Sequence, residues 1–171
     1  QKAYEEIGVS LGPLMKTRAD LALLAGMPKE AYRLATRHLE LLESGSVEIE
    51  RPLALHVSAR AALLDGRLTE AAAAAAEAAV LFSDQGRDAW CDRARFVETL
   101  AYIRAGDRGH EIDIEDLAER LDTYGLGFEA NQLRMESSVN LGSEAQRWHR
   151  IRAFDDEYPR RDRNTHEQIC R

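Results

Sequence analysis

Aromatic residues and prolines are scarce in this chain, and each shortage argues against a class of structure. Aromatics make up only 6% of the residues, and runs of alternating Val, Ile, Thr and aromatic residues are missing, which argues against a sheet. Only 4 prolines are present, so long stretches lack the residue that breaks helices. Alanine takes the place of the aromatics, as in the run 71–76, and it is the best helix former. Composition therefore predicts an all-α fold.

Cysteines are few, and long apolar runs are absent from the sequence. The 2 cysteines, Cys91 and Cys170, lie far apart and in no metal-binding spacing, which fits free thiols in a reducing compartment better than a disulfide scaffold. No apolar run approaches the roughly 20 residues of a membrane span. Because the chain begins with Gln1 and shows no signal peptide, we expect a cytoplasmic piece of a longer protein.

Positive charge is in deficit as well. The formal net charge is -7, whereas a domain that follows a phosphate backbone is usually basic. Nucleic acid is therefore not expected as a partner. The segment from Arg147 onward is locally basic, which fits a solvated tail.

The strongest positive signal is an internal repeat. Gly26, Gly66 and Gly106 each close a short apolar run and are spaced 40 residues apart, and Gly142 follows 36 residues later. Other residues keep the same register of 40 positions: Ala19 with Ala59, Leu23 with Leu63, Ala31 with Ala71 and Ala35 with Ala75. Each unit is expected to consist of two antiparallel helices joined by a tight turn, with the glycine ending the first helix.

The periodicity predicts helices near 10–25, 28–43, 50–65, 69–83, 88–105, 114–124, 128–141 and 144–153. It places a repeat domain over 1–154, with units near 10–48, 49–87, 88–126 and 127–154, followed by a charged segment, 155–171, as a tail or short helix. Apolar stripes are expected on the following residues: Leu55, Ala59, Ala62 and Leu63; Ala71, Ala75, Ala78 and Phe82; Ile114, Leu117, Leu121 and Tyr124; and Phe128, Gln132, Met135 and Val139.

The Gly-x-x-x-Glu-Ala turns at 26–31 and 66–71 resemble the turn of tetratricopeptide (TPR) repeats. Small residues at Ala19, Ala59, Ala35 and Ala75 also fall where that family places them. The unit is longer than the family's usual length of about 34 residues, and the family's Trp, Leu-Gly and Tyr signature is absent from the first helices. The resemblance implies a right-handed superhelix of stacked helix pairs, an α-solenoid.

A narrower likeness lies in residues 81–90, Leu-Phe-Ser-Asp-Gln-Gly-Arg-Asp-Ala-Trp. This segment resembles the inter-repeat segment of actinobacterial CHAT-domain proteins, whose caspase-like peptidase domain follows the repeats. That likeness implies a regulatory region whose catalytic His and Cys lie outside this chain.

Motifs for catalysis are missing, since the chain has no Gly-rich phosphate loop, no His-Glu-x-x-His and no nucleophile elbow. We expect no enzymatic activity and no cofactor. His166 and Cys170 form at most half of a metal site. The acids around Asp113 lack the spacing of a calcium loop, and Asp113 itself is expected to cap a helix. Cys91 is expected to be a buried small hydrophobe.

Binding of another protein is the favoured function. In a stack of helix pairs, the first helix of each unit lines the concave face. The groove positions that the TPR resemblance implies are Lys16, Asp20, His56, Arg60, Arg93, Phe96, Gln132 and Glu136. Such a groove suits a peptide, a partner domain or another domain of the same chain. The alternative is a ligand-sensing segment of a large transcriptional activator, and the bland interpretation is a set of merely exposed scaffold positions.

Overall fold

The computed structural model describes residues 11–43, 49–107 and 113–139. Within these ranges the chain consists of helices and short turns, with no strand. The helices are α2 (Leu11–Leu24), α3 (Pro28–Glu43), α4 (Arg51–Leu64), α5 (Leu68–Asp84), α6 (Asp88–Ala105) and α7 (Ile114–Thr123), and residues 127–139 are helical as well. The all-α prediction is confirmed for this part of the chain, and the predicted helix boundaries agree with the observed ones to within about two residues. The helix expected at 144–153 and the segment 155–171 lie outside the described residues.

The short turns that the structure describes in full share one hydrogen-bond pattern. After α4, the N–H of Gly66 donates to the Leu63 carbonyl at 3.3 Å and the N–H of Arg67 donates to the Ala62 carbonyl at 2.9 Å. These two bonds form the Schellman motif, which ends a helix on a left-handed residue. Gly66 has a φ of 78°, which glycine adopts without the clash of a Cβ atom. The helix-ending role predicted for Gly66 is confirmed.

The structure adds a turn that the 40-residue glycine spacing does not include. Between α5 and α6, Gly86 has a φ of 65° and donates to the Ser83 carbonyl at 2.9 Å, while Arg87 donates to the Phe82 carbonyl at 2.9 Å. The same motif therefore joins helices both within and between the predicted units.

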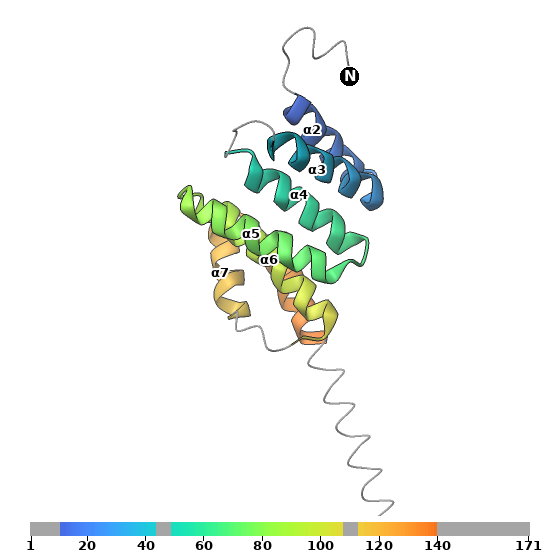
Figure 1. The fold of residues 1–171 in the computed structure, drawn as a ribbon. Helices are drawn as coiled ribbons and strands as arrows, with labels where there is room; N and C mark the ends of the chain where they lie inside the picture. The colour runs from blue at the N-terminus through green and yellow to red at the C-terminus, as the bar shows by residue number, and fades with distance from the viewer. Residues whose placement is uncertain (1–10, 44–48, 108–112, 140–171) are drawn as a thin grey trace, which may run out of the picture.

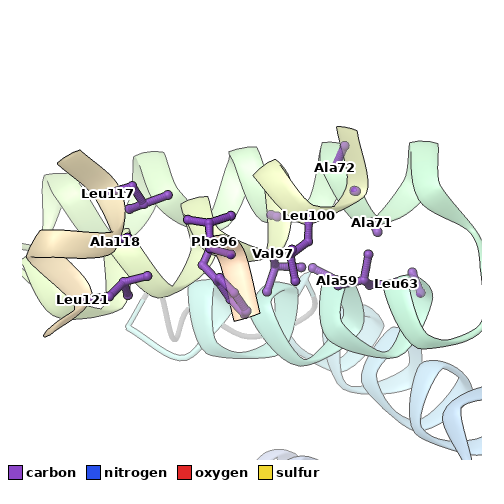
Figure 2. Close-up of a cluster of buried hydrophobic side chains, with 14 of the residues drawn as sticks. Ala59, Leu63, Ala71, Ala72, Phe96, Val97, Leu100, Leu117, Ala118 and Leu121 are labelled. Carbon is purple, nitrogen blue, oxygen red and sulfur yellow. The ribbon is translucent and has the colours of Figure 1, made fainter. Parts of the chain in front are cut away.

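Successive helices from α2 to α7 pack against one another in sequence order, and they lie side by side in Figure 1. Helix α4 also contacts α2 and α6, the helices two places before and after it in the chain. Figure 2 shows the largest core cluster, in which side chains of α4, α5, α6 and α7 meet. The stripes predicted for α4 and α5 are buried in full. Their alanines allow the helix axes to approach closely.

In α7 the sequence prediction is right at the start of the helix and wrong just after its end. The side chain of Asp113 accepts hydrogen bonds from the backbone N–H groups of Glu115 and Asp116, at 3.1 and 3.0 Å, as an N-cap does. Leu117 and Leu121 are fully buried, but Tyr124 is 43% exposed. Tyr124 follows the last helical residue, where the chain turns away from helical geometry, so the stripe does not extend to it.

The helix at 127–139 buries a different face from the one that the sequence suggested. Ala130 and Leu133 are fully buried, whereas Phe128, Met135 and Val139 are 80%, 63% and 71% exposed. These three residues of the predicted stripe are therefore exposed rather than buried in the described structure. None of the described helices is long and apolar enough to cross a lipid bilayer.

Candidate functional site

A pocket of about 440 Å³ lies where α4, α6 and the helix at 127–139 face one another. We call it the α4–α6 pocket. Its walls combine apolar side chains with three arginines, one histidine, one glutamate and one glutamine. The lining residues are His56, Arg60, Leu63, Leu64, Arg93, Phe96, Val97, Leu100, Arg104, Phe128, Glu129 and Gln132.

Five of the eight groove positions implied by the TPR resemblance line this pocket: His56, Arg60, Arg93, Phe96 and Gln132. Glu136 borders it, because its carboxylate accepts a hydrogen bond from the Gln132 amide at 2.9 Å. The remaining two positions, Lys16 and Asp20, are not among the lining residues. They form an ion pair with each other on α2, at 2.9 Å.

His56 contributes a buried imidazole to the pocket wall. It is only 3% exposed, and its ring meets the rings of Phe82 and Trp90 edge-on, at centroid distances of 6.4 and 5.8 Å. Burial, with smaller effects from Arg60 and Arg93, lowers the pKa of His56 to about 3, so the ring is neutral at physiological pH. Its Nδ1 atom has no hydrogen-bond partner within the described residues.

Two of the three arginines that line the pocket, Arg93 and Arg104, form ion pairs with glutamates. The Arg93 guanidinium lies 3.4 Å from the Glu129 carboxylate and 4.9 Å from the centroid of the Trp90 ring, in cation–π geometry. The Arg104 guanidinium makes two hydrogen bonds to Glu136, at 2.6 and 2.8 Å. These pairs connect α6 to the helix at 127–139.

Arg60 differs from both. It is half-buried and lines the pocket, and in the described part of the chain no carboxylate lies within ion-pair distance of its guanidinium. Burial and the positive charge of Arg93 lower the pKa of Arg60, while the negative charges of Asp20 and Glu129 act to raise it. The guanidinium is still protonated at any physiological pH.

Apart from Phe96, the apolar side chains of the pocket were not predicted as groove positions, and neither was Arg104. Leu63 is predicted only as part of the core stripe, and the sequence analysis does not name Val97 or Leu100. Helical spacing contained the necessary signal, since positions 93, 96, 97, 100 and 104 share one face of α6. Helical spacing does not give the separation of α4 and the helix at 127–139 from α6, and this separation forms the pocket.

A second hollow, of about 530 Å³, lies along α3 and is also lined by arginines. Its Arg33 and Arg37 side chains pair with Glu30 and Glu40 on their own helix, both at 2.7 Å. Arg67 pairs with Asp65 at 2.9 Å and lies over the Tyr32 ring. Arg18 and Lys29 also line this hollow without an ion pair in the described structure, but both are exposed and remain hydrated, whereas Arg60 is half-buried.

The other residues considered from sequence carry no visible site. Cys91 is buried in a cluster with Leu55 and Phe82, as expected for a small hydrophobe. Over residues 11–43, 49–107 and 113–139, no group of three or more His, Cys, Asp and Glu side chains is placed to hold a metal ion. His166 and Cys170 lie outside these residues.

Comparison with protein-family models, curated proteins and solved structures finds no match to this chain.

Proposed function

We propose that this chain is a TPR-like helical-repeat module that binds a peptide or partner domain along one row of its helices. The α4–α6 pocket is the observation that carries the proposal. Side chains from three helices, far apart in sequence, converge there on one half-enclosed hollow with both apolar and charged walls.

The arrangement of the helices supports the same interpretation. Helix α4 contacts both α2 and α6, so these alternate helices form a row, and in a TPR-like superhelix the first helices of successive units line the concave face. A partner segment lying on this face would cross α4, α6 and the helix at 127–139 in turn. Helical-repeat proteins commonly use such a surface to hold extended or helical peptides.

The rim of the pocket favours a macromolecular partner over a small ligand. Leu64 and Phe128 line the pocket and are 57% and 80% exposed. Apolar side chains that protrude at a pocket mouth can be covered by a partner that extends beyond it. The alternative function, sensing of a small ligand, draws its support from the volume, which lies in the usual range for such sites.

A capture experiment with matched variants tests the proposal. The 171-residue chain is immobilised, incubated with a lysate of the organism that makes it, and the retained proteins are identified by mass spectrometry. The binding variant is Arg60→Glu, and the control is Arg95→Glu, which reverses a charge at an exposed position of α6 outside the pocket. We expect a specific protein to be retained by the wild type and the control and lost with Arg60→Glu. A small molecule retained in place of a protein would overturn the proposal in favour of the sensor.

A further inference from the structure

The balance of charge in the α4–α6 pocket specifies what a ligand must bring. Three arginines line the pocket, Arg60, Arg93 and Arg104. Two carboxylates oppose them directly, Glu129 at Arg93 and Glu136 at Arg104. Lys16 and Asp20 neutralise each other on the neighbouring α2, and His56 is neutral. One positive charge, that of Arg60, is left without a partner in the described structure.

A half-buried guanidinium without a carboxylate is an unfavourable arrangement, because burial removes part of its hydration without supplying ionic hydrogen bonds. An incoming carboxylate would restore them in the two-pronged geometry that arginine favours. His56 also lines this pocket, but its unpartnered Nδ1 atom is buried away from solvent. Among the three arginines that line the pocket, Arg60 is therefore the one that a ligand can reach without displacing an ion pair of the described structure.

The surroundings of Arg60 are apolar on the sides that the charged pairs do not occupy. Leu63, Phe96 and Leu100 line the pocket and are buried, whereas Leu64 and Phe128 line it and are exposed. A ligand whose charge reached Arg60 would therefore place its adjacent atoms against hydrocarbon and aromatic surfaces.

We propose that the α4–α6 pocket selects a peptide segment in which one Asp or Glu side chain stands next to a bulky apolar residue. The carboxylate pairs with Arg60, and the apolar side chain packs on Leu64 and Phe128, the exposed apolar side chains that line the pocket. This inference rests on the proposed function, since it names the chemistry of the segment that the module binds. The surplus of a single positive charge fits a carboxylate better than a phosphorylated side chain, which carries nearly two negative charges.

Selection from a displayed library of random peptides tests the inference. Constant sequence flanks each displayed segment on both sides, so the segment has no free C-terminus. Any carboxylate that it offers therefore belongs to an Asp or Glu side chain. We expect the enriched peptides to share an Asp or Glu beside Phe, Leu, Ile or Met. One enriched peptide, N-acetylated and C-amidated, is then titrated by fluorescence anisotropy together with its Glu→Gln or Asp→Asn counterpart.

The decisive measurement is the coupling between the peptide acid and Arg60. With the wild-type chain, we expect neutralising the peptide acid to weaken binding about tenfold to hundredfold, as for loss of an ionic hydrogen bond. With Arg60→Gln, both peptides should bind equally weakly, and with the Arg95→Gln control the full difference should persist. Circular dichroism and thermal unfolding check that Arg60→Gln is folded. Selection on Arg60→Glu should lose the acidic residue, which a purely structural role for Arg60 does not predict.

The possible failures are distinguishable. If peptides are enriched and bind but show no preference for an acid, or if the acid matters equally with Arg60→Gln, the inference is wrong and the peptide-binding function stands. If no peptide is enriched by the folded wild-type chain, the inference fails together with the peptide-binding form of the proposed function. A clear preference for phosphorylated over acidic versions of the enriched peptide would overturn the single-carboxylate assignment.

Discussion

The Arg104 guanidinium and the Glu136 carboxylate form a two-pronged ion pair, with nitrogen–oxygen distances of 2.6 and 2.8 Å, that joins α6 to the helix at 127–139. The two residues are 32 positions apart in the chain. Their pairing fixes one side of the α4–α6 pocket, and it removes Arg104 from the charges available to a ligand.

Arg104→Gln is expected to destabilise the fold modestly at neutral pH. Both side chains are about one-third exposed, so solvent screening limits the loss to roughly 0.5–1 kcal/mol in the free energy of unfolding. The hydrogen bond from Arg104 lowers the pKa of Glu136 from its ordinary value of 4.5. The stabilisation is therefore present above pH 4.5 and is lost as the pH falls through the lower, folded-state value.

Urea unfolding at pH 7 and at a pH well below 4.5 measures this effect. The difference between wild type and Arg104→Gln should shrink at the acidic pH. Arg37→Gln, which breaks an exposed pair within α3, is the control and should change stability less. A difference that stays constant with pH would show that the ion pair is not the cause.

Ala75→Glu is expected to unfold the helical array. Ala75 is fully buried where α5 packs on its neighbours, so a glutamate there must bury a charge or force the helices apart. The expected loss is about 3 kcal/mol or more, seen as lost helicity or cooperativity in a circular-dichroism melt. Ala73→Glu, at an exposed position of the same helix, should melt like the wild type. Full stability of Ala75→Glu would show that the buried face of α5 is assigned wrongly.

Phe82→Ala is expected to remove the centre of the cluster behind His56. The Phe82 ring is fully buried, stacks on Trp90 at a centroid distance of 5.6 Å and lies under the Arg87 guanidinium. Its truncation should reduce the free energy of unfolding by about 3–5 kcal/mol and change the fluorescence of Trp90. Val80→Ala, at a 60% exposed position of α5, should stay within about 0.5 kcal/mol of wild type. Similar losses for the two variants would contradict the packing described here.

His56 should make the stability depend on pH. Burial lowers its pKa from 6.5 to about 3, so between these values the unfolded chain binds a proton that the folded chain does not. The free energy of unfolding should therefore fall as the pH drops from about 6.5 toward 3, by up to about 1.4 kcal/mol per pH unit. Urea unfolding of wild type and His56→Gln across this range measures the slope, which the variant should reduce.

Burial lowers the pKa of His38 as well, so His38→Gln is measured in parallel to separate the two contributions. An NMR titration in which the His56 ring protons follow an ordinary pKa near 6.5 would contradict the assignment.

Some buried positions and helix ends could be predicted from the sequence, and others could not. The stripe from Ala71 to Phe82 could be predicted, because helical spacing decides which residues share a face and apolar residues gain free energy by burial. Gly66 could be predicted too, since a left-handed residue after an apolar run favours glycine. Tyr124 could not, because its spacing fits the stripe of α7 while the helix ends one residue earlier.

The sequence by itself determined the helices, most of their boundaries and the buried faces of α4 and α5, because these depend on local propensity and on a period of 3.6 residues. Only the tertiary structure decided which charges are compensated. Arg60, Arg93 and Arg104 look alike in the sequence, but Glu129 and Glu136 reach two of them from a helix more than thirty positions further along the chain. Distances between packed helices set such pairings, and these distances follow from how the side chains of all the helices fill the space between them.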